Sequence, residues 1–133
     1  MPRITVARAR AIFRAERARF AAVYPRAARA TLTIVDAECL GRGTCASRDL
    51  AECFTDTGEV RLLRRALTSE ARATALIRHE LSHVSDARIR ERGKEQRADD
   101  IAERVTGERI FYDREGVQTL RRGTYPRPRD LHR

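Results

Sequence analysis

The chain has 133 residues, a length that suits one domain and is too short for two of ordinary size. Hydrophobic residues make up 41% of it and aromatic residues only 5%, so we expect a modest core of Ala, Leu, Ile and Val. No apolar run approaches the roughly 20 residues of a transmembrane helix, and the arginine-bearing N-terminus lacks the apolar stretch of a secretory signal. These features exclude a membrane-spanning protein and lead us to expect a cytoplasmic one.

The net charge is +9, and arginines concentrate at the two ends of the chain. Residues 1–30 hold eight arginines against Glu16, and residues 114–133 hold six against Glu115 and Asp130, which leaves the middle slightly acidic. Basic ends can bind nucleic acid or an acidic partner, although a solvated helix face is the commoner explanation. Nucleic-acid binding is therefore a secondary hypothesis.

The first half of the chain predicts one helix and three strands. Apolar residues recur at helical spacing over residues 4–23, which indicates an amphipathic helix ended by Pro25. The expected apolar positions of this helix are Val6, Ala9, Phe13, Phe20 and Val23. The alternating, β-branched segment 31–37 predicts a strand, and residues 54–63 predict a hairpin around Asp56-Thr57-Gly58. Arginines in its second arm, residues 59–66, suggest an exposed edge strand.

The second half predicts two helices and a final hairpin. Thr68-Ser69-Glu70 offers an N-cap for a helix that continues through an Ala-rich stretch, and Gly93 separates it from a second helix ending near Gly107. Residues 110–112 and 117–120 predict a hairpin. The sequence therefore predicts a single α+β domain with a small three- to four-stranded sheet. Residues 1–120 would form this domain, and residues 121–133 an extended basic tail.

The stretch His79-Glu80-Leu81-Ser82-His83 carries the clearest chemical signal. On a helix, His79 and His83 lie about one turn apart on one face, so both imidazoles can reach a single Zn²⁺. Glu80 lies on the flank of that face, where it can touch a metal-activated water. The pattern predicts hydrolysis at a metal centre.

A catalytic zinc site needs a third protein ligand and an open position for water, and no further histidine lies nearby. Glu95 opens the second predicted helix on the same face as Ala98 and Ala102, so we predict that it is the third ligand. Because Glu95 follows His83 closely, this geometry requires the first helix to stop soon after Asp86. The alternative carboxylate ligands are Asp86, Asp99 and Glu103.

These motifs resemble the gluzincin zinc metallopeptidases, in which the HExxH helix is followed by a helix of the form E-x-x-A-D-x-x-A. The matching residues of the second helix are Glu95, Ala98, Asp99 and Ala102. The similarity is greatest to the minimal members called minigluzincins, and looser to metallopeptidases that accompany phage-repressor regulators. Element order agrees over roughly residues 4–107, but only residues 79–102 carry specific motifs.

The resemblance implies a role for each motif residue. His79, His83 and Glu95 would bind zinc. Glu80 would act as the general base and acid, and Asp99 would orient a ligand histidine. The last role also agrees with the usual hydrogen bond from a metal-binding imidazole to a carboxylate.

The sequence thus predicts a zinc metallopeptidase, with endopeptidase activity favoured, that cleaves peptides or proteins. Tyr112, Tyr125 or an arginine could donate to the developing oxyanion, and the edge strand at residues 59–66 could bind an extended substrate by β-addition. The alternative is a non-catalytic, metal-stabilised module whose basic termini bind nucleic acid or a protein.

Two features are compatible with a latent enzyme, although the sequence does not decide between a latent and an active form. The tail could fold over the cleft through residues such as Tyr125, Asp130 and His132. The odd number of cysteines predicts reduced thiols, most simply small buried residues, although a thiolate could also occupy the open metal position. These cysteines are Cys39, Cys45 and Cys53.

Overall fold

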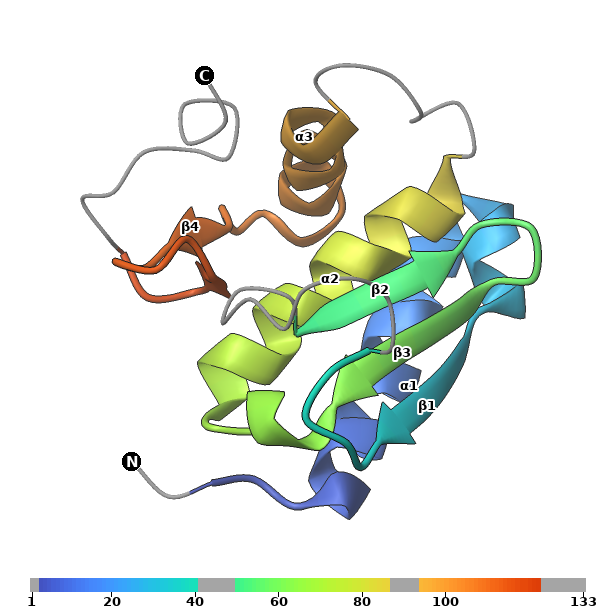
Figure 1. Cartoon of the computed structure of the whole chain (residues 1–133). Helices are drawn as coiled ribbons and strands as arrows, with labels where there is room; N and C mark the ends of the chain where they lie inside the picture. The colour runs from blue at the N-terminus through green and yellow to red at the C-terminus, as the bar shows by residue number, and fades with distance from the viewer. Residues whose placement is uncertain (1–2, 41–49, 87–93, 123–133) are drawn as a thin grey trace.

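A computed structural model describes residues 3–40, 50–86 and 94–122. These residues form an α+β fold with three α-helices, a three-stranded mixed sheet and a separate two-stranded sheet (Figure 1). The helices are α1 (Val6–Val23), α2 (Glu70–Ser85) and α3 (Lys94–Thr106), with short 3-10 helices at Pro25–Arg29 and Arg64–Ala66. The strands are β1 (Thr31–Val35), β2 (Ala51–Phe54), β3 (Glu59–Leu63), β4 (Phe111–Tyr112) and β5 (Gln118–Thr119).

The three-stranded sheet has the order β1-β3-β2, in which β2 and β3 form an antiparallel hairpin and β1 runs parallel to β3. The prediction that residues 59–66 form an edge strand is therefore wrong, because β3 is the central strand. Its Arg61 lies opposite Glu52 of β2 and forms an ion pair with it at 3.0 Å. Arg64 and Arg65 belong to the 3-10 helix that follows. Arg61 therefore lies on one face of the central strand, and Arg64 and Arg65 lie in a turn after it. The two edge strands of this sheet are β1 and β2.

The hairpin turn requires glycine at position 58. Gly58 has a φ of +83°, a backbone conformation that side chains with a Cβ rarely adopt. A Cβ at this position would also lie 3.1 Å from the carbonyl oxygen of Arg29. Because Gly58 has no side chain, Arg29, which precedes β1, can lie close to this turn.

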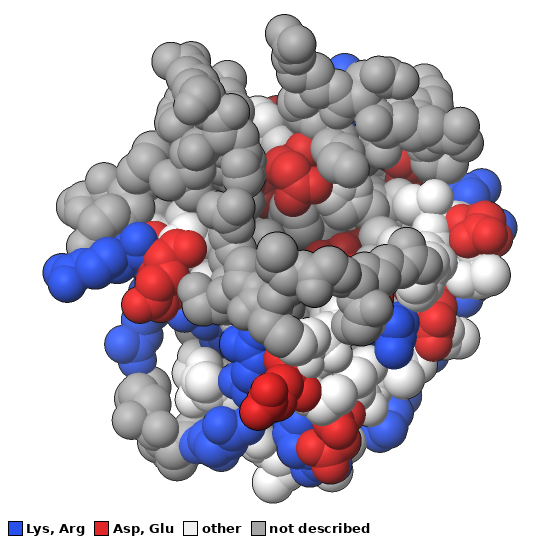
Figure 2. All heavy atoms as spheres, viewed as in Figure 1, with Lys and Arg blue, Asp and Glu red and all other residues white. Residues whose placement is uncertain are grey.

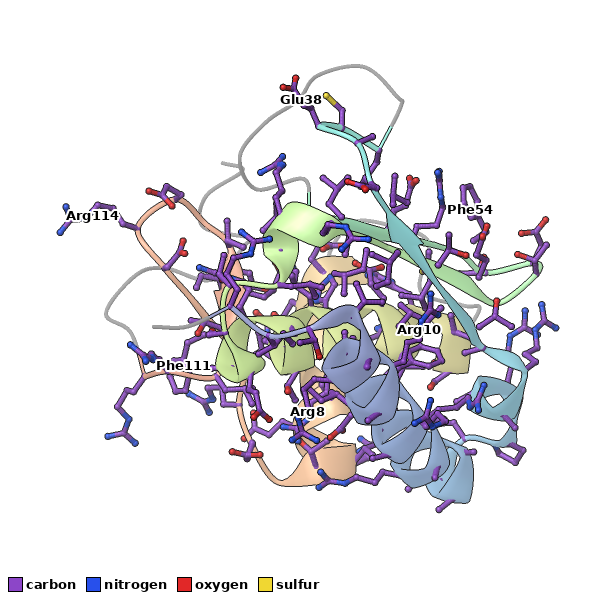
Figure 3. The ribbon with its side chains drawn as sticks, turned by 90° about the horizontal axis from the view of Figure 1, so that it is seen from below. Arg8, Arg10, Glu38, Phe54, Phe111 and Arg114 are labelled. Carbon is purple, nitrogen blue, oxygen red and sulfur yellow. The ribbon has the colours of Figure 1, made fainter. Side chains whose placement is uncertain are left out.

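The helices lie on one side of the sheet, as Figure 3 shows from below. Leu32, Val60 and Cys53 are directly opposite one another on neighbouring strands, so their side chains share a face. Val60 is fully buried on this face, and Leu32 and Cys53 pack against the core. The α1 stripe is buried at Ala9, Phe13 and Phe20 as predicted. The same prediction is wrong for Val23, which is 51% exposed.

The predicted C-terminal hairpin is confirmed, although it forms its own sheet instead of joining the first. β4 and β5 pair antiparallel, and the turn between them contains Asp113. Arg72 of α2 binds this hairpin through the backbone oxygen of Gln118 and the carboxylate of Asp113. The hairpin is thereby fixed beside α2. Nearly all of the predicted tail, residues 123–133, lies outside the described residues.

Candidate metal centre

The HExxH segment lies in α2, whose boundaries follow from local sequence. The Ser69 hydroxyl accepts a hydrogen bond from the Arg72 backbone N–H, and Glu70 places negative charge in the first turn. The helix ends at Ser85, and Asp86 already has an extended backbone. The helix therefore ends where the prediction for Glu95 requires it to end. Glu95, near the start of α3, can then lie beside α2.

The two histidines face each other within the helix. His79 and His83 are both buried, with ring centroids 4.9 Å apart and an interplanar angle of 78°. Their Nε2 atoms are 3.3 Å apart. The i, i+4 spacing has therefore produced the convergence of imidazole nitrogens that the sequence predicts.

Glu95, in the first turn of α3, completes a cluster with these nitrogens. One carboxylate oxygen lies 2.8 Å from His79 Nε2, and the other lies 3.1 Å from His83 Nε2. Among the described residues, His79, His83 and Glu95 form the one group of three His, Cys, Asp or Glu side chains whose donor atoms lie within 4.8 Å of one another. The cluster joins α2 to α3.

These distances suit a tetrahedral metal ion. With metal–nitrogen and metal–oxygen bonds of about 2.0–2.1 Å, neighbouring ligand atoms of a tetrahedron lie about 3.3 Å apart. The two imidazole nitrogens are 3.3 Å apart, and each contacts a different carboxylate oxygen of Glu95, at 2.8 and 3.1 Å. With one donor atom taken from each residue, all three atoms lie within 4.8 Å of one another. Two imidazoles and one carboxylate form a donor set that transition metals, zinc included, bind well. The residues present therefore fit a divalent ion with three protein ligands.

Asp99, one turn after Glu95 on α3, binds the other nitrogen of His79. Its Oδ1 lies 2.9 Å from His79 Nδ1, and Asp99 is buried. A carboxylate at this position keeps a proton on Nδ1, so that when His79 gives up its other ring proton the Nε2 lone pair is available to a metal. Asp99 therefore lies behind the cluster, as the resemblance implies, and not within it.

Tyr112 of β4 extends this hydrogen-bonded chain. Its hydroxyl donates to Asp99 Oδ2 at 2.5 Å. Burial and then the Asp99 charge raise the pKa of Tyr112 above its ordinary value, so the hydroxyl keeps its proton. Tyr112 was one of the residues predicted from the sequence as a possible donor to an oxyanion, but in the structure its hydroxyl donates to Asp99. No local pattern marks this pairing, because it depends on where the hairpin docks.

The charges of the cluster support one another. Burial would lower the pKa of His79, but hydrogen bonds to Asp99 and Glu95 outweigh it and raise the pKa well above the usual value. Burial would raise the pKa of Glu95, but its hydrogen bonds to His79 and His83 outweigh burial, so the pKa is strongly lowered. Glu95 is thus an anion at neutral pH, as a metal ligand must be.

Glu80 and Cys53 lie together beside the cluster. Glu80 is only 7% exposed, and the thiol of Cys53 donates a hydrogen bond to its carboxylate. Burial and then the charge of Glu80 raise the pKa of Cys53, so the thiol is protonated. The alternation of β2, in which Ala51 and Cys53 share the helix-facing side, is the signal that could have placed Cys53 at the site.

The alternative ligands lie elsewhere. Glu103 forms an ion pair with Arg109 at 3.4 Å, and both side chains are well exposed. Asp86 follows the last residue of α2 and is not part of the three-residue group. The structure therefore brings only Glu95, of the four carboxylates considered, to both histidine Nε2 atoms.

The latency predictions concern residues that are largely not described. Tyr125, Asp130, His132 and Cys45 lie outside the described residues. Cys39 is disulfide-bonded, so the expectation of reduced thiols is wrong for this residue, whereas Cys53 is a free thiol as expected.

The arginines bind mostly to other parts of the same molecule. Several donate to backbone carbonyls, as Arg17 does to Ala30 and Arg26 does to Thr55. On the face in Figure 2, basic and acidic side chains are interspersed and not separated by sign. Arg114 extends from the hairpin turn, far from Arg8 and Arg10 (Figure 3).

Comparisons with known proteins identify no relative: no family model matches the chain, and no similar curated protein or solved structure was found. The similarity to gluzincins therefore rests on the motif residues alone. No helix in the described part of the chain combines the length and apolar character needed to cross a membrane.

Proposed function

We propose that this protein is a zinc-dependent metallopeptidase, acting as a cytoplasmic endopeptidase on peptides or proteins. The observation that carries the proposal is the convergence of His79, His83 and Glu95 donor atoms, with Glu80 buried on the flank. A structural zinc site usually has four protein ligands, whereas three ligands leave a position for the reaction. The described residues supply three such ligands, and this number favours catalysis over a purely structural role.

His79, His83 and Glu95 would hold the ion, and bound zinc would polarise a peptide carbonyl and lower the pKa of the attacking water. Glu80 would accept a proton from the attacking water and deliver it to the leaving amide nitrogen. Asp99 keeps the proton of His79 on Nδ1, so that Nε2 remains a ligand.

The position of β2 supports an extended substrate. This strand pairs with β3 on one side, and no described strand pairs with its other side. Cys53 of the same strand contacts Glu80, so β2 runs close to the proposed general base. An extended peptide that pairs with β2 would present its backbone carbonyls near the cluster. β2 thereby takes the role that the sequence assigned to residues 59–66.

The proposal is tested by zinc content and proteolysis of purified protein, with Glu80→Gln as the central variant. An unfolded protein serves as substrate, and mass spectrometry identifies the fragments. Because glutamine keeps the shape of Glu80 but cannot take a proton, this variant should bind zinc normally and cleave at least about 100-fold more slowly. Glu103→Gln, on the exposed part of α3, is the matched control and should retain wild-type activity.

Cleavage by Glu80→Gln at the wild-type rate would contradict the role of Glu80. Zinc binding by the wild-type protein without cleavage of any unfolded protein would instead favour the alternative, a metal-stabilised binding module. Failure of the wild-type protein to bind zinc would exclude both.

A further inference from the structure

Asp99 is held at both of its carboxylate oxygens by different elements. His79 of α2 lies against Oδ1, and Tyr112 of β4 donates to Oδ2. All three side chains are buried, with at most 7% of each residue exposed. The resulting chain of hydrogen bonds runs from the C-terminal hairpin to the face of His79 opposite the cluster.

The hairpin that carries Tyr112 is itself attached to α2. Arg72, about two turns before His79, binds the Gln118 backbone and the Asp113 carboxylate of that hairpin. Tyr112 is therefore held at a defined height along the same helix that supplies two of the proposed metal ligands. Its hydroxyl position does not depend on the Asp99 contact alone.

The two-sided contact has a geometric consequence for Asp99. A carboxylate rotates about its terminal torsion with little intrinsic preference, because that torsion is broad. Donors at both oxygens restrict this rotation and keep Oδ1 against the Nδ1–H of His79. Loss of the Tyr112 hydroxyl would leave Oδ2 without this donor in a buried site and would release the carboxylate.

We propose that Tyr112 is a positioning residue of the metal centre, acting through Asp99 to fix the orientation and tautomer of His79. The inference rests on the proposed zinc site but not on catalysis. It assigns the β4–β5 hairpin a role in metal affinity that the HExxH and ExxAD motifs do not contain. Tyr112 touches neither the cluster nor a substrate in this role.

The test is the zinc dissociation constant, measured by competition with a chromophoric chelator. Tyr112→Phe keeps the ring and removes only the hydroxyl, so it should weaken zinc binding about 10-fold, the lower end for such supporting contacts. Asp99→Ala should weaken it at least as much. Tyr24→Phe removes a hydroxyl that accepts a hydrogen bond from Arg104, and it should leave the affinity unchanged.

A double-mutant cycle distinguishes positioning from general structural damage. If Tyr112 acts through Asp99, Tyr112→Phe should cause no further loss in the Asp99→Ala background. Losses that multiply in the double variant, or unchanged affinity of Tyr112→Phe, would overturn the inference while wild-type zinc binding stands. Absence of zinc binding in the wild-type protein would reject the proposed metal site itself. Urea unfolding of each variant, followed by circular dichroism, verifies that the proteins compared are folded.

Discussion

Arg78 and His79 are consecutive residues of α2, yet their side chains meet different carboxylates. Arg78 binds Glu16 of α1 through two nitrogens, at 2.9 and 3.1 Å, and binds Glu108 through a third. His79 meets Asp99 and Glu95 of α3. One turn of α2 thus holds a structural ion pair and a candidate ligand, and both depend on carboxylates from other helices.

The buried pair predicts a large loss of stability when one partner is removed. The side chains of Arg78 and Glu16 are 5% and 8% exposed, so Arg78→Ala leaves Glu16 buried without its main partner. We expect a decrease of about 3–5 kcal/mol in the free energy of unfolding, measured in urea. Replacing both residues with methionine should recover much of this loss, since no unpaired charge remains.

The exposed pair of Arg8 and Glu70 is the matched control, with both side chains more than half exposed. Arg8→Ala should change stability little, because solvent screens such a pair. Equal losses in Arg78→Ala and Arg8→Ala would show that burial does not determine the strength of the Arg78 contacts.

The β4–β5 hairpin shows how a short element is held by polar contacts. Each of its strands has two residues, too few for independent stability. Asp113 organises its turn. The carboxylate accepts hydrogen bonds from the backbone N–H groups of Glu115 and Val117, and it forms an ion pair with Arg72. The element therefore depends on one ionised carboxylate and one arginine of α2.

This dependence predicts a pH effect on stability. Burial would raise the pKa of Asp113, but the backbone bond from Val117 and the contact with Arg72 outweigh burial, so the pKa is lowered. A carboxyl whose pKa is lower in the folded state stabilises the protein above its unfolded pKa of about 3.9, and that contribution is lost as pH falls through the folded pKa. Urea unfolding should show a steeper decline between about pH 5 and pH 2 for wild type than for Asp113→Asn. Parallel pH profiles for the two proteins would contradict this account.

At the scale of the whole molecule, the proposed ligands join two consecutive helices that pack against each other. His79 and His83 come from α2, and Glu95 comes from α3. The complete ligand set therefore exists only when the two helices are packed together. A metal that binds this set stabilises the folded protein, because the unfolded chain offers no comparable site.

Zinc should therefore raise stability in proportion to its binding. At a free zinc concentration of 100 times the dissociation constant, the free energy of unfolding should rise by about 2.7 kcal/mol, and a chelator should reverse the gain. Glu95→Gln should lose most of this effect, whereas Glu103→Gln should keep it, because Glu103 pairs with Arg109 away from the cluster. Thermal or urea unfolding with and without zinc measures both. If zinc stabilised Glu95→Gln and Glu103→Gln equally, Glu95 would not be a zinc ligand.

Local pattern was sufficient for much of the α+β fold. The helical spacing of apolar residues predicted α1, the cap at Ser69 predicted the start of α2, and the i, i+4 spacing predicted that His79 and His83 converge. These features depend on residues within a few turns of one another, where backbone geometry relates sequence spacing directly to position. The candidate role of Glu95 was likewise suggested by its place at the start of α3.

Contacts between distant segments were decided by tertiary structure. The crossover that places β1 beside β3 made β3 central and left β2 as the edge near Glu80, although arginines had suggested the reverse. Docking of the hairpin brought Tyr112 to Asp99, and the pairing of β2 brought Cys53 to Glu80. Sequence determined the local elements and the residue types able to bind a metal. Only the packing of those elements determined which side chains contact the proposed metal-binding residues. Packing depends on surfaces contributed by residues far apart in the chain, which local sequence patterns do not describe.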